Sequence, residues 1–194
     1  MSYFITTPIY YVNDVPHIGH AYTTIACDIL SRFSKLKGDE TFFLTGTDEH
    51  GQKVEKAALS NKKGTQDFVD EMSQNFRDLI PYLGCEIDDF IRTTEERHKI
   101  SAQFLWNKLK NNDEIYLSNY EGWYSIRDEA FYLESELTET DKGFVAPSGA
   151  PVDWVKEESY FFKLSKWEDK LINYYKENPE SILPRSRYNE VLSF

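Results

Sequence analysis

Strand-like runs alternate with helical segments along the first 114 residues, and this alternation limits the fold more than any other feature. Buried strands are indicated at residues 4–7, 41–45 and 90–93, where aromatic and β-branched side chains gather. Residues 9–16, which follow Pro8, end at Pro16 and contain an Asn-Asp pair, are expected to form a loop. Strands that alternate with helices pair in parallel and are joined by crossover helices. The sequence therefore predicts an α/β fold with a parallel sheet over residues 1–114.

Helical segments follow the strands. Apolar side chains recur every three or four positions in residues 17–37, and Gly38 supplies a stop. Further helices are expected at residues 52–59 and 65–83. A fourth helix is expected after the third strand, with Thr94 as its N-cap and two glutamates in its first turn, where negative charge suits the helix dipole.

The pattern changes from about residue 115. Short aromatic strands are expected there, at residues 115–117, 121–126, 130–133 and 160–164. Ser165 and Glu168 match a capping box that would open a helix, and Asn178 with Pro179 would end it. Residues 115–194 are therefore predicted to form a second, small α+β module.

Composition limits the partners and the location of the chain. The formal charge is -11, so the chain by itself is expected to bind nucleic acid weakly, because phosphate contacts need lysine and arginine. Neither Cys27 nor Cys85 lies in a C-x-x-C pair, which favours buried thiols in a reducing cytosol. There is no signal-peptide pattern and no apolar stretch of roughly 20 residues, so a cytoplasmic location without membrane binding is expected.

Two histidines mark the start of the first helix, in the run Pro16-His17-Ile18-Gly19-His20. A helix that begins after a strand of a parallel sheet offers free N–H groups and a positive dipole end, which favour phosphate. His17 and His20 lie one turn apart and could stabilise charge on phosphate oxygens, while Gly19 would let a flat base approach the backbone. The alternative is that both histidines are cap or surface residues. A metal site is disfavoured, because no third Cys or His lies nearby in the sequence.

A second polar cluster, Gly46-Thr47-Asp48-Glu49-His50-Gly51, follows the next strand. Carboxyl ends of parallel strands share one edge of a sheet, so Asp48 could pair there with an ammonium group. Alternatively, Asp48 or Thr47 caps the following helix, and His50 is a solvated turn residue. Tyr10 and Tyr11 either line an apolar pocket beside this edge or pack in the core.

At these residues the chain resembles class I aminoacyl-tRNA synthetases, and residues 16–20 match their HIGH signature. Further runs resemble the methionyl-tRNA synthetases within that class, at residues 6–14, 44–51, 157–165 and 187–191. The resemblance implies the amino-terminal half of a Rossmann-like catalytic domain at residues 1–114 and a connective insertion at residues 115–194. It also implies three ligands: methionine, ATP with Mg²⁺, and tRNA(Met).

The resemblance assigns roles to individual residues. It implies that His17 and His20 contact the ATP phosphates and act in catalysis, and that Gly19 lies against adenine. Asp48 would bind the α-ammonium group of methionine. The remaining pocket residues would contact the methionine side chain, and they are Ile9 and Tyr11.

The chain also departs from the family pattern. In many members the connective insertion holds a zinc knuckle with two C-x-x-[CH] pairs. The nearest positions here lack the required thiolates, so no zinc is expected; they are Ser125, Asp128, Val145 and Ser148. The K-M-S-K-S motif of the family's second half-site is also missing. We therefore expect a fragment that ends within the insertion and is inactive alone.

Two kinds of alternative function stay open. H-x-G-H also occurs in nucleotidyltransferases, which are compact and lack an aromatic module, and in synthetases for other aliphatic amino acids, which carry a larger insertion. The chain could instead be a non-catalytic binding module.

Overall fold

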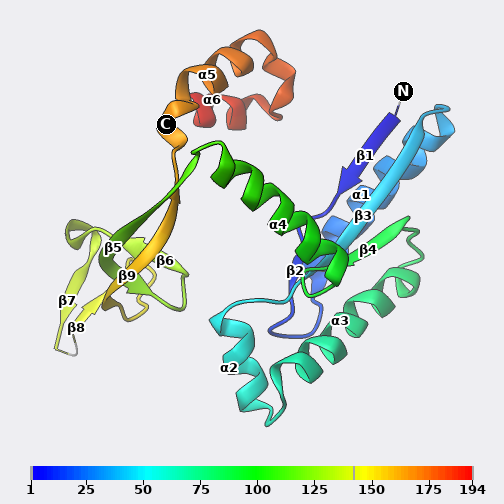
Figure 1. Cartoon of the computed structure of the whole chain (residues 1–194). Coiled ribbons are helices and arrows are strands. Elements are labelled where there is room, and N and C mark those ends of the chain that lie inside the picture. The colour runs from blue at the N-terminus through cyan, green and yellow to red at the C-terminus, as the bar shows by residue number, and fades with distance from the viewer. Residues whose placement is uncertain (1, 142, 194) are drawn as a thin grey trace.

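The computed structural model describes residues 2–141 and 143–193, and the first half of this part is built on a parallel sheet (Figure 1). The central strand of the sheet is β3 (Glu40–Asp48). β1 (Ser2–Thr6) and then β2 (Tyr10–Tyr11) pair with one side of β3, and β4 (Asp89–Arg92) pairs with the other. All of these pairings are parallel, which confirms the predicted α/β sheet.

Four helices accompany this sheet, α1 (Ile18–Leu36), α2 (Gln52–Ser60), α3 (Thr65–Tyr82) and α4 (Glu96–Asn111). Each of the first three helices begins and ends within one residue of its predicted bounds. The core between α2, α3 and the sheet is apolar, with Val12, Val54, Phe68, Val69, Phe76 and Phe90 among its buried members. This core packs α3 against the sheet, and Figure 1 shows α3 running alongside β4.

Two expectations about strands in this half were incomplete. β3 runs on to Asp48, beyond the predicted end at residue 45, because β2 and β4 pair with its last residues. Gly46 permits the close approach of β4, since a Cβ there would lie 2.0 Å from the Ile91 carbonyl oxygen. The short strand β2 lies inside the predicted loop, and only its long-range pairing with β3 makes it a strand.

The predicted cap of α4 was wrong. The N-cap is Glu95, which makes no side-chain capping hydrogen bond. The Thr94 hydroxyl instead donates to the Glu49 carboxylate, so a long-range partner competes successfully with the local cap. The two cysteines are free thiols; Cys85 is buried as expected, whereas Cys27 is only partly buried.

The second half contains a long antiparallel ribbon. β5 (Ile115–Ser125) pairs with β9 (Asp153–Phe162) from Ile115 opposite Phe162 to Tyr124 opposite Asp153. The two predicted strands at 115–117 and 121–126 are therefore one strand, because the polar residues between them also pair with β9. Shorter strands complete this half, namely β6 (Ala130–Tyr132), β7 (Thr138–Thr140) and β8 (Gly143–Val145).

Aromatic rings cross the ribbon: Tyr116 stacks on Phe161 and Trp123 meets Trp154 edge-on, with centroids 5.5 Å and 5.3 Å apart. Such ring pairs stabilise a ribbon that buries few side chains. Two helices follow the ribbon in the sequence. These are α5 (Glu168–Glu177) and α6 (Arg185–Ser193) (Figure 1). A separate domain from residue 115 stays a prediction.

The expected capping box of α5 was wrong. Its N-cap is Trp167, without a side-chain capping bond, and Ser165 lies in a short 3-10 turn. The Trp167 indole N–H donates to Glu114 at 3.0 Å, so a tertiary contact fixes the start of this helix. Asn178 is the C-cap, as predicted. Among the described residues, 3-10 turns lie at Glu134–Glu136, Leu164–Lys166 and Pro179–Ser181. In the part of the chain that the structure describes, no helix has the length and apolarity needed to cross a bilayer.

Candidate functional site

His17 and His20 cap the first turn of α1 through their ring nitrogens, and we call this pair the histidine cap. His17 is the N-cap residue, and its Nδ1 accepts a hydrogen bond from the Gly19 N–H at 3.0 Å. In return, the His20 Nδ1 accepts from the His17 N–H at 3.0 Å. This reciprocal pattern is a capping box made of imidazoles, and it brings the two rings to 3.8 Å between centroids.

The cap fixes which ring nitrogens carry protons. Because both Nδ1 atoms accept hydrogen bonds, neutral imidazoles here hold their protons on Nε2. Burial, together with the neighbouring His17, lowers the pKa of His20 from its ordinary value of 6.5. The His20 ring packs edge-on against Tyr10 and Phe76, with centroids 4.8 Å and 5.1 Å away. The Nε2–H groups are thus available as donors at a helix start.

Gly19 is explained by the cap itself. A Cβ at this position would lie 2.9 Å from Cε1 of His17, closer than real Cβ contacts allow. The sequence suggested that Gly19 leaves room for a flat base. The structure adds a separate reason, since a larger residue at position 19 would displace the ring that caps the helix.

Asp48 is the last residue of β3, and the histidine cap begins α1. β2 connects the two, because Tyr10 pairs in register with Thr47 and Tyr11 with Asp48. The Tyr10 ring packs against His20, and its hydroxyl lies 2.9 Å from Thr24 Oγ1 of α1. Both predicted polar clusters therefore lie at the carboxyl end of the sheet.

The alternative role of the second cluster, a helix cap, does not apply. The N-cap of α2 is Gly51, and no side chain caps that helix. Asp48 is partly buried and His50 is exposed, with its Nε2 3.3 Å from the Thr93 carbonyl oxygen. Tyr10 packs in the core, while Ile9 and Tyr11 are 41% and 53% exposed, so they are the ones open to a ligand.

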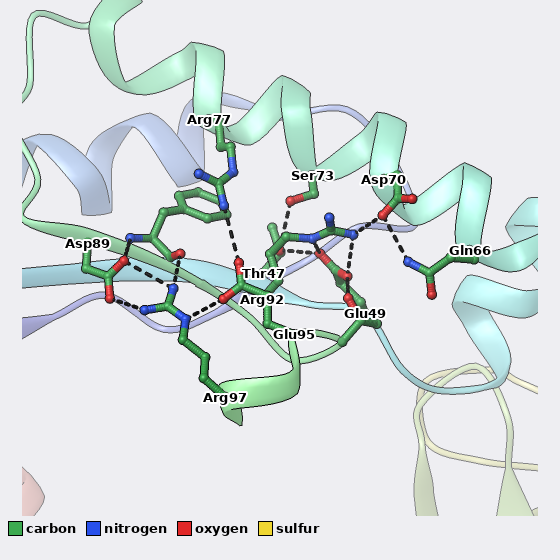
Figure 2. A network of polar contacts seen from close by, with 12 residues as sticks. Thr47, Glu49, Gln66, Asp70, Ser73, Arg77, Asp89, Arg92, Glu95 and Arg97 are labelled. Carbon is green, nitrogen blue, oxygen red and sulfur yellow. Dashed lines mark hydrogen bonds and ion pairs between the residues drawn. The ribbon is translucent and has the colours of Figure 1, made fainter. Parts of the chain in front are cut away.

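A buried charge network next to Asp48 was not predicted (Figure 2). The Glu49 side chain is fully buried. Arg92 of β4 donates two hydrogen bonds to its carboxylate, from Nε at 2.7 Å and from Nη2 at 2.9 Å. Arg92 Nη2 also binds Asp70 of α3. Hydroxyls of Thr47 and Thr94 donate to the same carboxylate. We call these five residues the strand-end network.

Competing effects set the ionisation of Glu49. Burial alone raises the pKa of its carboxyl, but hydrogen bonds from Arg92, Thr94 and Thr47 outweigh burial and leave the pKa below its ordinary value. The contact with Glu49 raises the pKa of Arg92 in turn. The pair is therefore ionised at neutral pH. The sequence gives little indication of this ion pair. Glu49 lies in the polar run after one predicted strand, and Arg92 lies near the end of another.

The four positions of the predicted zinc-free knuckle do not suit a zinc ion. Ser125 Oγ accepts from the Asp128 N–H at 3.2 Å, and the hydroxyls of Ser148 and Tyr132 donate to the Asp128 carboxylate. Hydroxyls and one carboxylate already engaged in hydrogen bonds are poor ligands for zinc, which favours thiolate and imidazole. Within residues 2–141 and 143–193, no group of three or more His, Cys, Asp or Glu side chains is arranged to hold a metal. The absence of zinc itself stays a prediction.

Comparison with known proteins decides the family. The profile of the family described as "tRNA synthetases class I (M)" matches residues 3–142. The chain belongs to the class I tRNA synthetases (M). A methionine–tRNA ligase of Rickettsia bellii is 62% identical to this class I synthetase chain over 193 residues, which is 100% of the chain and 37% of that ligase. A Listeria monocytogenes methionine–tRNA ligase is 48% identical over 99% of the chain and 30% of its own length.

A solved structure supports the same family and fold. The Mycobacterium tuberculosis methionyl-tRNA synthetase bound by methionyl-adenylate is 44% identical to this class I synthetase chain and superposes with a TM-score of 0.93. The match covers 100% of the chain and 39% of the tuberculosis protein. The chain thus spans between 30% and 39% of the length of these relatives.

Proposed function

We propose that this chain supplies the first half of the active site of a methionine–tRNA ligase. In the complete synthetase, the methionine carboxylate attacks the α-phosphorus of ATP and pyrophosphate leaves, which gives methionyl-adenylate. The acyl group then passes to tRNA(Met). The observation that carries the proposal is the placement of the histidine cap and Asp48 at one end of the sheet, connected through Tyr10.

The histidine cap suits phosphate. Its imidazoles, when neutral, keep Nε2–H as a donor, and the N-terminal end of the α1 helix dipole adds positive potential. Donors held in place before the reaction stabilise the charge that develops on phosphate oxygens in the transition state. We assign His17 and His20 this catalytic role, and Gly19 to the adenine side of the ATP site. Mg²⁺ would accompany the ATP phosphates.

The end of β3 suits the amino acid. Asp48 offers a carboxylate to the α-ammonium group of methionine, and Ile9 and Tyr11 offer exposed apolar surface to its thioether side chain. The chain carries a net charge of -11, so most contacts with tRNA would come from elsewhere in the synthetase. Without the second half-site, the chain alone would not catalyse activation. A cytoplasmic location stays a prediction from the sequence.

ATP–pyrophosphate exchange tests this function in the complete synthetase that carries the chain. We expect methionine to drive exchange and leucine or isoleucine to fail. Exchange driven by leucine or isoleucine would overturn the proposed specificity. No exchange with any amino acid, but adenylyl transfer to a phosphorylated acceptor, would instead indicate a nucleotidyltransferase.

A further inference from the structure

The buried carboxylate of Glu49 is adjacent in sequence to the proposed amine-binding residue. A fully buried charge costs free energy unless hydrogen bonds and an opposite charge compensate it. Here the guanidinium group of Arg92 and the hydroxyls of Thr47 and Thr94 compensate the charge of Glu49 (Figure 2). A chain needing only a stable strand end could place an apolar side chain here, so the ion pair calls for a further reason.

Thr93, which stands between Arg92 and Thr94 of the network, fixes the backbone on both sides of Asp48. On one side, the Thr47 carbonyl oxygen accepts from the Thr93 N–H at 3.2 Å. On the other, the Glu49 N–H donates to Thr93 Oγ1 at 2.9 Å. Asp48 stands between these two tethers, and its backbone also pairs in register with Tyr11 of β2. The position of its Cα is thereby set from both sides.

The network also connects this strand end to α3. Arg92 reaches Asp70, and the Thr47 hydroxyl lies 3.2 Å from the Ser73 hydroxyl. Ser73 is buried, and its helix belongs to the same apolar core as Tyr10. Three elements, β3, β4 and α3, thus meet at one buried carboxylate, that of Glu49.

We propose that Glu49 and Arg92 are positioning residues, which hold the Asp48 carboxylate where it meets the ammonium group of the amino acid substrate. This inference rests on the proposed function. It assigns no contact with the substrate to either residue. Their effect passes through the backbone of Asp48, and small displacements of a binding group are enough to weaken a site.

The position of the substrate amine is the same before and during the attack on ATP. An interaction of this kind contributes equally to the ground state and the transition state, so its loss raises KM and leaves kcat nearly unchanged. In the complete synthetase, Glu49→Gln keeps the side-chain shape but removes the charge that Arg92 grips. We expect a rise of about tenfold in the KM for methionine, with the KM for ATP and kcat within about twofold of the parent.

A double-mutant cycle shows whether Glu49 acts through Asp48. We expect Asp48→Asn alone to raise the KM for methionine at least as much as Glu49→Gln. Adding Glu49→Gln to Asp48→Asn should raise it no further, because the group being positioned is already gone. The matched control is Asp89→Asn on β4, the strand of Arg92; it breaks an exposed ion pair with Arg97 of α4 and should change neither KM.

The outcomes separate this inference from the proposed function. Equal losses for ATP and methionine after Glu49→Gln, additive effects in the cycle, or an unchanged KM would each overturn the positioning role alone. No methionine-dependent exchange in the parent enzyme would overturn the proposed function and this inference with it. If Glu49→Gln does not fold, Arg92→Lys is assayed in the same way, since it keeps the charge and loses the two-pronged grip.

Discussion

The histidine cap and the strand-end network lie at the same end of the sheet, yet they are held in different ways. The cap joins residues three apart, and its hydrogen bonds stay within one turn of α1. The network joins Glu49 to Arg92, 43 positions away, and draws in α3. His17 is exposed, whereas the Glu49 carboxylate is fully buried. The comparison indicates that the two regions have different roles. The histidine cap offers hydrogen-bond donors to the nucleotide, and the buried charge of Glu49 fixes the part of the site that binds the amino acid.

The sharpest test of this difference in role is kinetic. In the complete synthetase, His17→Ala or His20→Ala should lower kcat about 10²- to 10³-fold, the usual effect of losing a donor to transition-state charge. The KM for methionine should change little. ATP–pyrophosphate exchange over a range of methionine concentrations measures both quantities. His98→Ala on α4 is the control and should behave as the parent.

On the other side of the comparison, Asp48→Ala should chiefly raise the KM for methionine. If the histidine variants and the Asp48 variant all weakened methionine binding equally, with an unchanged chemical step, the two regions would not differ in role.

Arg92 of β4 and Arg97 of α4 provide the next comparison, between a buried and an exposed ion pair (Figure 2). Arg92→Ala leaves the Glu49 charge buried and unpaired, which should destabilise the end of β3 by about 3 kcal/mol. Arg97→Ala removes surface pairs with Asp89 and Glu95 and should cost less than about 1 kcal/mol. Hydrogen exchange of the β3 amides measures the local effect. Similar protection in the two variants would show that burial of the Glu49 pair does not matter.

Sequence reasoning found the cap side of this comparison and missed the network side. The first strand, α1 and the polar run around Asp48 depend on local spacing, which a sequence displays directly. The partnership of Glu49 with Arg92, and the strand β2 itself, depend on contacts between distant segments. The same reason explains why local spacing wrongly predicts Thr94 as a helix cap, since its partner Glu49 lies 45 positions away. The roles of the site residues stay predictions.

A smaller effect is expected at Gly19. Gly19→Ala places a methyl group 2.9 Å from the His17 ring, so the ring must leave its capping position. Loss of an N-cap costs about 1 kcal/mol, and kcat should fall because the donor is displaced. Hydrogen exchange at the start of α1 and exchange kinetics measure the two effects. Gly64→Ala serves as a control for glycine replacement, because φ there is -62° and a Cβ would meet only the Asp67 side chain, at 3.3 Å. Unchanged kcat in Gly19→Ala would show that the cap geometry is not needed.

The smallest effect concerns pH. His20 has a pKa below 6.5 in the folded chain because of burial and the neighbouring His17. The folded state therefore binds this proton less readily than the unfolded state, and the contribution of His20 to stability is complete above pH 6.5 and is lost as the pH falls through the lowered pKa. A ring-proton NMR titration should give a midpoint below 6.5, and His20→Gln should weaken the acid sensitivity of the melting temperature. A midpoint above 6.5 would contradict the neutral cap.

The central claim is that the histidine cap and Asp48 face one ligand from neighbouring parts of the sheet. A crystal structure of the complete synthetase with a non-hydrolysable sulfamoyl analogue of methionyl-adenylate tests this most directly. The account predicts that the Asp48 carboxylate binds the ligand ammonium group and that the Nε2 atoms of His17 and His20 approach the sulfamoyl group, which stands where the α-phosphate would be. A ligand held away from either cluster would contradict it.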